Sequence, residues 1–82
     1  MLATIRRLVD EQGRLTAGAA TLHEDADLYA SGLTSFAAVQ LMLALEETFD
    51  IEFPERMLNR RSFASIAAIA SCIAELKPEE VA

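Results

Sequence analysis

Two adjacent hydroxyl side chains, Thr34 and Ser35, are the residues of this 82-residue chain whose position could support chemistry. They follow Gly32 and precede the most apolar run in the chain, which predicts that they begin a helix. A helix N-terminus presents unpaired amides and about half a positive charge, so it favours a phosphate group. A phosphodiester on a first-turn serine would lie where that field is strongest. Helix capping explains two hydroxyls here as well, so these two residues alone leave both interpretations open.

The other residues that could do chemistry are isolated. His23 is the single histidine and lies among acidic residues, without the second soft ligand that a metal site needs. A catalytic triad would require that same histidine to reach Ser35. Cys72 is the single cysteine and falls on the apolar line of a predicted helix, where a small core residue is expected. We therefore predict no metal site and no autonomous enzyme.

Length and composition predict one small all-α domain. A chain of this size buries only about 60% of its unfolded surface, which leaves no room for a deep, water-free active site. Hydrophobic residues make up 52% of the chain, with three Gly and no Trp, and Ala, Leu, Ile, Glu and Arg dominate. We expect a single domain over residues 1–77 and a frayed tail over 78–82.

The formal net charge of −6 limits the partners. An acidic surface repels phosphate backbones and anionic lipids, so we expect no nucleic acid and no membrane partner, and basic protein surfaces fit better. One cysteine cannot form a disulfide framework. Early charges in the chain disfavour a signal peptide, and no apolar run has the length of a membrane span. These features predict a location in the reducing cytoplasm.

Apolar periodicity predicts an amphipathic helix over residues 2–12, ending around Gly13. A long connection follows, which we expect to be ordered because four leucines can attach it to a core: Leu15, Leu22, Leu28 and Leu33. A second helix is predicted over residues 35–49, with Thr34 as its N-cap. Two apolar stripes cover most of this helix, Phe36/Val39/Leu43 and Ala38/Leu41/Met42/Leu45/Phe49, so we expect neighbours to pack on several sides.

Pro54 suits the first turn of a short third helix over residues 55–58. Ser62 is the predicted N-cap of a last helix that stops before Pro78, with an apolar inner face at Phe63, Ile66, Ile69, Ala70, Ile73 and Leu76. The expected architecture has three longer helices, one short helix and a long first loop.

The stretch "ADLYASGLTSFAAVQLMLALEETFDIEFPE" resembles the acyl carrier protein family, small four-helix bundles that carry a 4′-phosphopantetheine arm on a serine. The likeness spans about residues 26–76 and rests on the order and spacing of Gly32, Ser35, Leu41, Leu45, Glu46, Glu47, Phe49, Ile51 and Pro54. It implies that Ser35 is the attachment residue. It also implies that a phosphopantetheinyl transferase supplies the arm from coenzyme A.

The chain departs from the family pattern in ways that bear on the cargo. Thr34 replaces the usual Asp, Phe36 replaces the usual Leu, and the acidic residues cluster late in the second helix instead of early. "LTSF" followed by "VQL" resembles the stand-alone carriers of activated amino acids. Those carriers are loaded by ligases similar to class II aminoacyl-tRNA synthetases or by adenylation enzymes. A carrier of fatty-acyl or polyketide chains and an unmodified helical adaptor are the alternatives.

We expect partners, including a ligase and a downstream acceptor enzyme, to dock beside Ser35. The candidate contact residues come from the loop, the start of the second helix and the short helix: Leu33, Thr34, Phe36, Gln40, Arg56, Met57 and Arg60. Exposed Phe36 and Met57 would supply apolar contact area, and the arginines would set orientation. Phe36 as a core anchor and the arginines as a solvated basic face are the alternatives.

Overall fold

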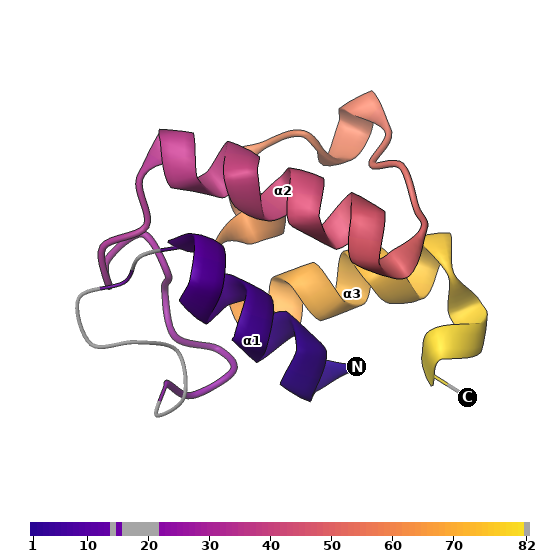
Figure 1. The fold of residues 1–82 in the computed structure, drawn as a ribbon, viewed down its shortest axis with the longest axis horizontal. Coiled ribbons are helices and arrows are strands. Elements are labelled where there is room, and N and C mark those ends of the chain that lie inside the picture. The colour runs from indigo at the N-terminus through magenta and orange to yellow at the C-terminus, as the bar shows by residue number, and fades with distance from the viewer. Residues whose placement is uncertain (14, 16–21, 82) are drawn as a thin grey trace.

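The computed structural model describes residues 1–13, 15 and 22–81, and this part of the chain contains helices and no strand (Figure 1). The three α-helices are α1 (Leu2–Gly13), α2 (Ser35–Phe49) and α3 (Ile66–Leu76). Three short 3₁₀ turns complete the fold: η1 (Glu55–Met57), η2 (Arg60–Phe63) and η3 (Pro78–Val81). The predicted all-α class is confirmed, and so are the predicted first and second helices.

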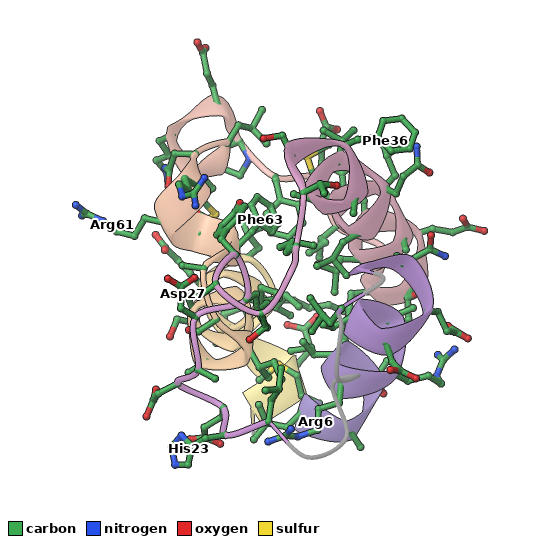
Figure 2. The ribbon with its side chains drawn as sticks, turned by 90° about the vertical axis from the view of Figure 1, so that its left-hand side faces the viewer. Arg6, His23, Asp27, Phe36, Arg61 and Phe63 are labelled. Atoms are coloured by element: carbon green, nitrogen blue, oxygen red, sulfur yellow. The ribbon has the colours of Figure 1, made fainter. Side chains whose placement is uncertain are left out.

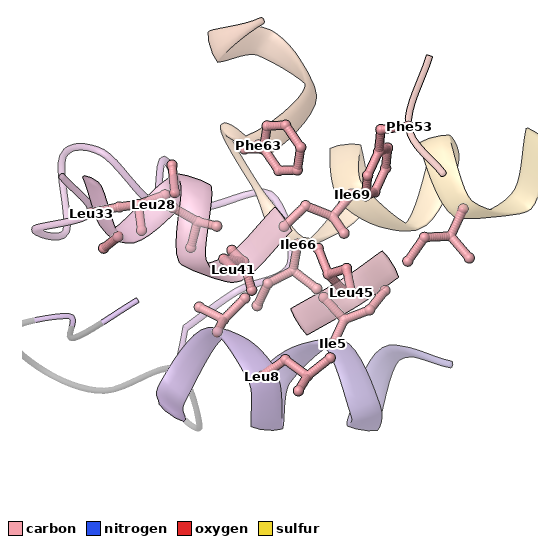
Figure 3. Close-up of a cluster of buried hydrophobic side chains, with 14 of the residues drawn as sticks. Ile5, Leu8, Leu28, Leu33, Leu41, Leu45, Phe53, Phe63, Ile66 and Ile69 are labelled. Carbon is pink, nitrogen blue, oxygen red and sulfur yellow. The ribbon is translucent and has the colours of Figure 1, made fainter. Parts of the chain in front are cut away.

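One apolar core joins the three α-helices, with side chains from each converging between them (Figure 3). The largest fully buried side chains come from α1, the loop, α2 and α3: Ile5, Val9, Leu28, Leu41, Leu45, Ile66, Ile69 and Ile73. Burial of a side chain of this kind contributes about 1.5–3 kcal/mol, so this cluster fixes the relative positions of the helices.

The loop before α2 is attached to the core as expected. Leu28 is fully buried and Leu33 is nearly so, while Leu15 and Leu22 are partly buried and pack against the core. Two backbone hydrogen bonds join the loop to the segment at the start of α3. The Leu28 N–H donates to the Ala64 carbonyl at 2.7 Å, and the Ala67 N–H donates to the Glu24 carbonyl at 2.8 Å. Residues 14 and 16–21 of the predicted connection lie outside the described residues.

The last helix begins later than predicted. Ser65, not Ser62, is the N-cap of α3, and its hydroxyl accepts a bond from the Ala68 N–H at 3.0 Å. Ser62 lies inside η2, where its N–H donates to the Asn59 side chain at 3.0 Å. That bond starts a separate 3₁₀ turn, which places Phe63 in the core before α3 begins. The predicted short third helix is the 3₁₀ turn η1.

The expectation that neighbours pack on several sides of α2 is wrong for one of its two apolar stripes. Phe36, Val39 and Leu43 are 75%, 50% and 51% exposed. The buried residues of α2 lie on its other side: Ala37, Ala38, Leu41, Leu45 and Phe49. The neighbouring elements cover one face of α2, and the stripe formed by Phe36, Val39 and Leu43 stays at the surface.

The far end of the bundle is closed by Lys77, whose Nζ donates to the Phe49 carbonyl at 2.7 Å and so joins the ends of α3 and α2. Residues Pro78–Val81 form η3, and fraying of the tail over 78–82 stays a prediction. Within the described ranges, no helix has both the length and the apolar character needed to cross a membrane.

Candidate functional site

Ser35 is the first residue of α2, and its side chain is exposed. The two hydroxyls at this point have different environments. Thr34 performs the capping, because its Oγ1 accepts a bond from the Ala37 N–H at 3.0 Å and its carbonyl accepts from the Ala38 N–H at 2.9 Å. In the described part of the chain, the Ser35 hydroxyl makes no hydrogen bond. It is therefore an accessible hydroxyl at the positive end of a helix dipole.

We expect Thr34→Ala to lower the free energy of unfolding by about 1 kcal/mol, since it removes the bond to the Ala37 N–H. Thr34→Ser keeps that acceptor and should retain most of the stability. Denaturant unfolding of the two variants and the wild type measures the difference. Equal stability of Thr34→Ala and Thr34→Ser would contradict Thr34 as the cap.

The turn before α2 keeps the approach to Ser35 open. Gly32 adopts a φ of 115°, a conformation that side chains disfavour, and its N–H donates to the Tyr29 carbonyl at 3.2 Å. The Leu33 N–H then donates to the Leu28 carbonyl at 3.0 Å, which turns the Leu33 side chain into the core. A tight turn, anchored by buried Leu28 and Leu33, therefore precedes α2 and carries no side chain at Gly32.

An open groove of about 330 Å³ begins at Ser35 and runs between α2 and the η1–η2 segment. Its walls are mainly apolar and include Ala38, Val39, Met42, Leu58 and Phe63. Its polar groups besides Ser35 include Tyr29 and Arg60. The groove fits a slender, mostly apolar chain attached to the serine.

Arg60 lies over the face of Tyr29, with its guanidinium carbon 3.9 Å from the ring centroid. Burial raises the pKa of the Tyr29 phenol above its ordinary value of 10.0, while the charge of Arg60 lowers that pKa and the charge of Asp27 raises it. The raised pKa means that the folded chain holds the proton more tightly than the unfolded chain. The contribution of Tyr29 to stability is therefore complete below the ordinary pKa and is lost as pH rises through the folded pKa.

Removal of Arg60 should raise the pKa of Tyr29 further, because a cation that stabilises the phenolate is lost. Tyr29 is the single tyrosine and the chain has no tryptophan, so phenolate absorbance during an alkaline titration reports this residue alone. Arg61→Ala is the matched control and should leave the curve unchanged. A lower pKa in Arg60→Ala would contradict the pairing.

Of the predicted docking residues, Leu33 and Met57 need correction, because each is only 4% exposed. Met57 is buried because η1 turns its side chain into the core, so it offers no apolar contact area. The prediction that Phe36 is exposed is confirmed, and Figure 2 shows its side chain directed away from the bundle. Its interpretation as a core anchor is therefore excluded.

The remaining docking candidates lie at the surface: Thr34, Gln40, Arg56 and Arg60. Arg56 forms an ion pair with Glu75 of α3 at 3.0 Å. Gln40 and Phe36 line a second open hollow beside the end of α1, together with Thr34. Arg60 lies in the groove on one side of Ser35, and Phe36 and Gln40 lie on the other side. Arg56 lies toward the end of α3, away from Ser35.

Sequence reasoning missed three groups near Ser35. It assigned no function to Tyr29 or Leu58, and it gave Val39 only a packing role. Their shared surface depends on contacts between segments distant in the sequence, which periodicity does not report. One signal in the sequence could have identified Val39. With Phe36 and Leu43 it forms a narrow apolar stripe, separate from the stripe that faces the core.

The other candidate groups do not form a site. His23 is exposed, with its Nδ1 3.7 Å from an Asp25 carboxylate oxygen, and Cys72 is a half-buried free thiol. In residues 1–13, 15 and 22–81, no three His, Cys, Asp or Glu side chains are grouped as a metal site requires.

Comparison with known proteins identifies the kind of site. Residues 3–73 match the family described as "Phosphopantetheine attachment site". An aminoacyl carrier protein of Agrobacterium fabrum is 56% identical over 73 residues, which cover 89% of this chain and 88% of that protein. A D-alanyl carrier protein of Lactobacillus delbrueckii is 32% identical over 76 residues, covering 92% and 95% of the two chains.

Solved structures agree with this assignment. In the crystal structure of an engineered Bradyrhizobium japonicum glycine:[carrier protein] ligase complexed with a carrier protein from Agrobacterium tumefaciens and AMP, the matching chain gives a TM-score of 0.86 at 56% identity. That match covers 89% of this chain and 97% of the other. In the crystal structure of the B. japonicum ligase complexed with glycylated carrier protein, the matching chain gives a TM-score of 0.74 at 28% identity, covering 87% of this chain and 95% of that one. The chain therefore belongs to the phosphopantetheine-attachment family, the carrier proteins that hold their cargo on this arm and are not themselves catalysts.

Proposed function

We propose that this protein is a stand-alone carrier that holds an activated aminoacyl group as a thioester on a 4′-phosphopantetheine arm attached to Ser35. The observation that carries the proposal is that Thr34 and Ser35 have different roles at the start of α2. Thr34 caps the helix, and this leaves the exposed Ser35 hydroxyl available for modification. The carrier domain comprises residues 1–77.

The residues around Ser35 fit the arm. The N-terminal amides of α2 favour the phosphodiester, and the apolar groove can accept the chain that follows it. Once attached, the arm supplies a terminal thiol that binds the cargo as a thioester. Gly32 leaves space for the active site of a phosphopantetheinyl transferase.

An aminoacyl cargo suits the interior of this protein better than a fatty chain does. A fatty chain gains about 0.8 kcal/mol for each CH₂ that it buries, so its carrier benefits from space between the helices. Here Leu41, Leu45 and Ile69 fill the centre of the bundle and have no exposed surface. An aminoacyl group carries an ammonium that is costly to bury, and it needs no internal space. The relatives named aminoacyl and D-alanyl carrier protein support the same cargo class.

The loading enzyme is an amino-acid:carrier-protein ligase or an adenylation enzyme, and a downstream acceptor enzyme receives the cargo. Partners dock on the exposed residues around Ser35, with Phe36 and Gln40 on one side and Arg60 on the other. The stripe of Phe36, Val39 and Leu43 supplies apolar area at this surface. The single cysteine supports a place in the reducing cytoplasm.

Loading of the arm-bearing protein tests this function. The protein is first modified with coenzyme A and a transferase, then incubated with ATP, single amino acids and a glycine:[carrier protein] ligase. We expect a mass increase of one aminoacyl residue that hydroxylamine removes, as for a thioester. Parallel incubation with an acyl-carrier synthetase and fatty acids is the control. Loading by the acyl enzyme alone would overturn the aminoacyl proposal, and full partner binding without any arm would favour an adaptor.

A further inference from the structure

Arg60 and Tyr29 line the same groove as Ser35, although they come from different segments of the chain. Tyr29 belongs to the loop before α2, and Arg60 is the first residue of η2. Their contact places a cation, with its guanidinium carbon 3.9 Å from the ring centroid, at the wall of this mainly apolar groove.

Both partners are held in place by the surrounding structure. The Tyr29 N–H donates to the Asp27 Oδ1 at 2.9 Å, and the preceding Leu28 is fully buried. On the other side, η2 is capped by Asn59 and ends at buried Phe63, whose ring packs edge-on against Phe53 with centroids 5.4 Å apart. Arg60 therefore extends from a capped turn onto the ring of a residue whose backbone is held by the loop.

The pairing of Arg60 differs from that of two other arginines of the chain. Arg56 is paired with Glu75 at 3.0 Å, and Arg7 is paired with Glu11 at 3.2 Å. No carboxylate of the described residues lies within ion-pair distance of Arg60, although the chain carries a net charge of −6. Arg61 is exposed, does not line the groove, and points away from the bundle in Figure 2.

Resting on the proposed function, we propose that Arg60, positioned by Tyr29, binds the phosphodiester of the arm on Ser35 and holds the arm against the groove. The phosphodiester then lies between two positive elements, the N-terminus of α2 and the Arg60 guanidinium. A guanidinium binds phosphate oxygens through charge-assisted hydrogen bonds, which are stronger than neutral ones. The aromatic face of Tyr29 stabilises the cation without neutralising it.

Phosphorus NMR of the arm-bearing protein tests this assignment. The variants are Arg60→Ala and Tyr29→Leu, with Arg61→Ala as the matched arginine control and Tyr29→Phe as the conservative variant that keeps the ring. Intact mass first verifies one arm on each protein. We expect wild type, Arg61→Ala and Tyr29→Phe to share one phosphodiester chemical shift, and Arg60→Ala and Tyr29→Leu to share a different one. Added NaCl should move the wild-type shift toward that of Arg60→Ala and leave Arg60→Ala nearly unchanged.

Two results overturn the inference, and they are distinguishable. If arm-bearing wild type and Arg60→Ala have the same phosphorus shift and the same salt response, Arg60 does not bind the phosphodiester, while the carrier function stands. If wild type takes up no arm, the mass measurement shows this before any spectrum is recorded, and the proposed function fails together with the inference.

Discussion

Replacing Ser35 with alanine is expected to abolish arm attachment completely, because alanine lacks the hydroxyl oxygen that forms the phosphodiester. The wild-type protein should gain one phosphopantetheine from coenzyme A, and the Ser35→Ala protein should gain none. The variant should still fold, since Ser35 is exposed and Thr34 supplies the cap. A change in stability within about 0.5 kcal/mol is expected for such a surface position. Intact mass and a denaturant unfolding curve measure both effects.

Ser71→Ala is the matched control for this result, because Ser71 is an exposed helical serine on α3, away from the start of α2. It should take up the arm as wild type does. If the Ser35→Ala protein still takes up the arm, Ser35 is not the attachment residue. This holds whether or not Ser71→Ala loses arm attachment.

Truncation of Leu45 is expected to have the largest effect on stability. Leu45 lies in the middle of α2 with no exposed surface, and it packs into the cluster that joins the three helices. Leu45→Ala should lower the free energy of unfolding by about 2–5 kcal/mol, from lost apolar burial and the cavity left behind. Because small domains have only about 5–15 kcal/mol of stability in total, the melting temperature should fall strongly. Thermal and denaturant unfolding measure the loss.

Leu43→Ala makes the same chemical change two residues away on α2, where the side chain is 51% exposed. It should cost far less than Leu45→Ala, since half of the side chain is already in water. Similar losses in the two variants would contradict the orientation of α2 in which Leu45 faces the core and Leu43 faces solvent.

The parts of the fold that the sequence predicts well depend on local patterns. Apolar spacing and the glycine at its end predict α1, and the hydroxyl of Thr34 before a long apolar run predicts the start of α2. Leucines in an otherwise polar connection predict that the loop packs on the core, as Leu28 and Leu33 do. In each case, a few neighbouring residues determine the outcome.

The start of α3 could not be fixed in the same way, because "SFAS" offers two serines three residues apart and each can cap a helix. The choice depends on Asn59, which binds the Ser62 N–H and directs this segment into η2. The burial of Met57 has a similar origin, since a short turn has too few residues to show an apolar period.

The exposure of the Phe36, Val39 and Leu43 stripe depends on which neighbours are present. Hydropathy marks these residues as apolar, but it does not report that the bundle covers only one face of α2. The pairing of Tyr29 with Arg60 likewise arises only when the loop and η2 come together in the fold. The sequence therefore predicts Ser35 as the candidate attachment residue, while the groove beside it depends on tertiary contacts.

The most direct test of the central hypothesis is to locate the arm on the wild-type protein. After modification with coenzyme A and a transferase, the protein is digested, and the peptide that contains Thr34 and Ser35 is fragmented in the mass spectrometer. We expect the entire phosphopantetheine mass on Ser35 and an unmodified Thr34. An arm on Thr34 or on any other residue, or no arm with transferases from several sources, would contradict the hypothesis.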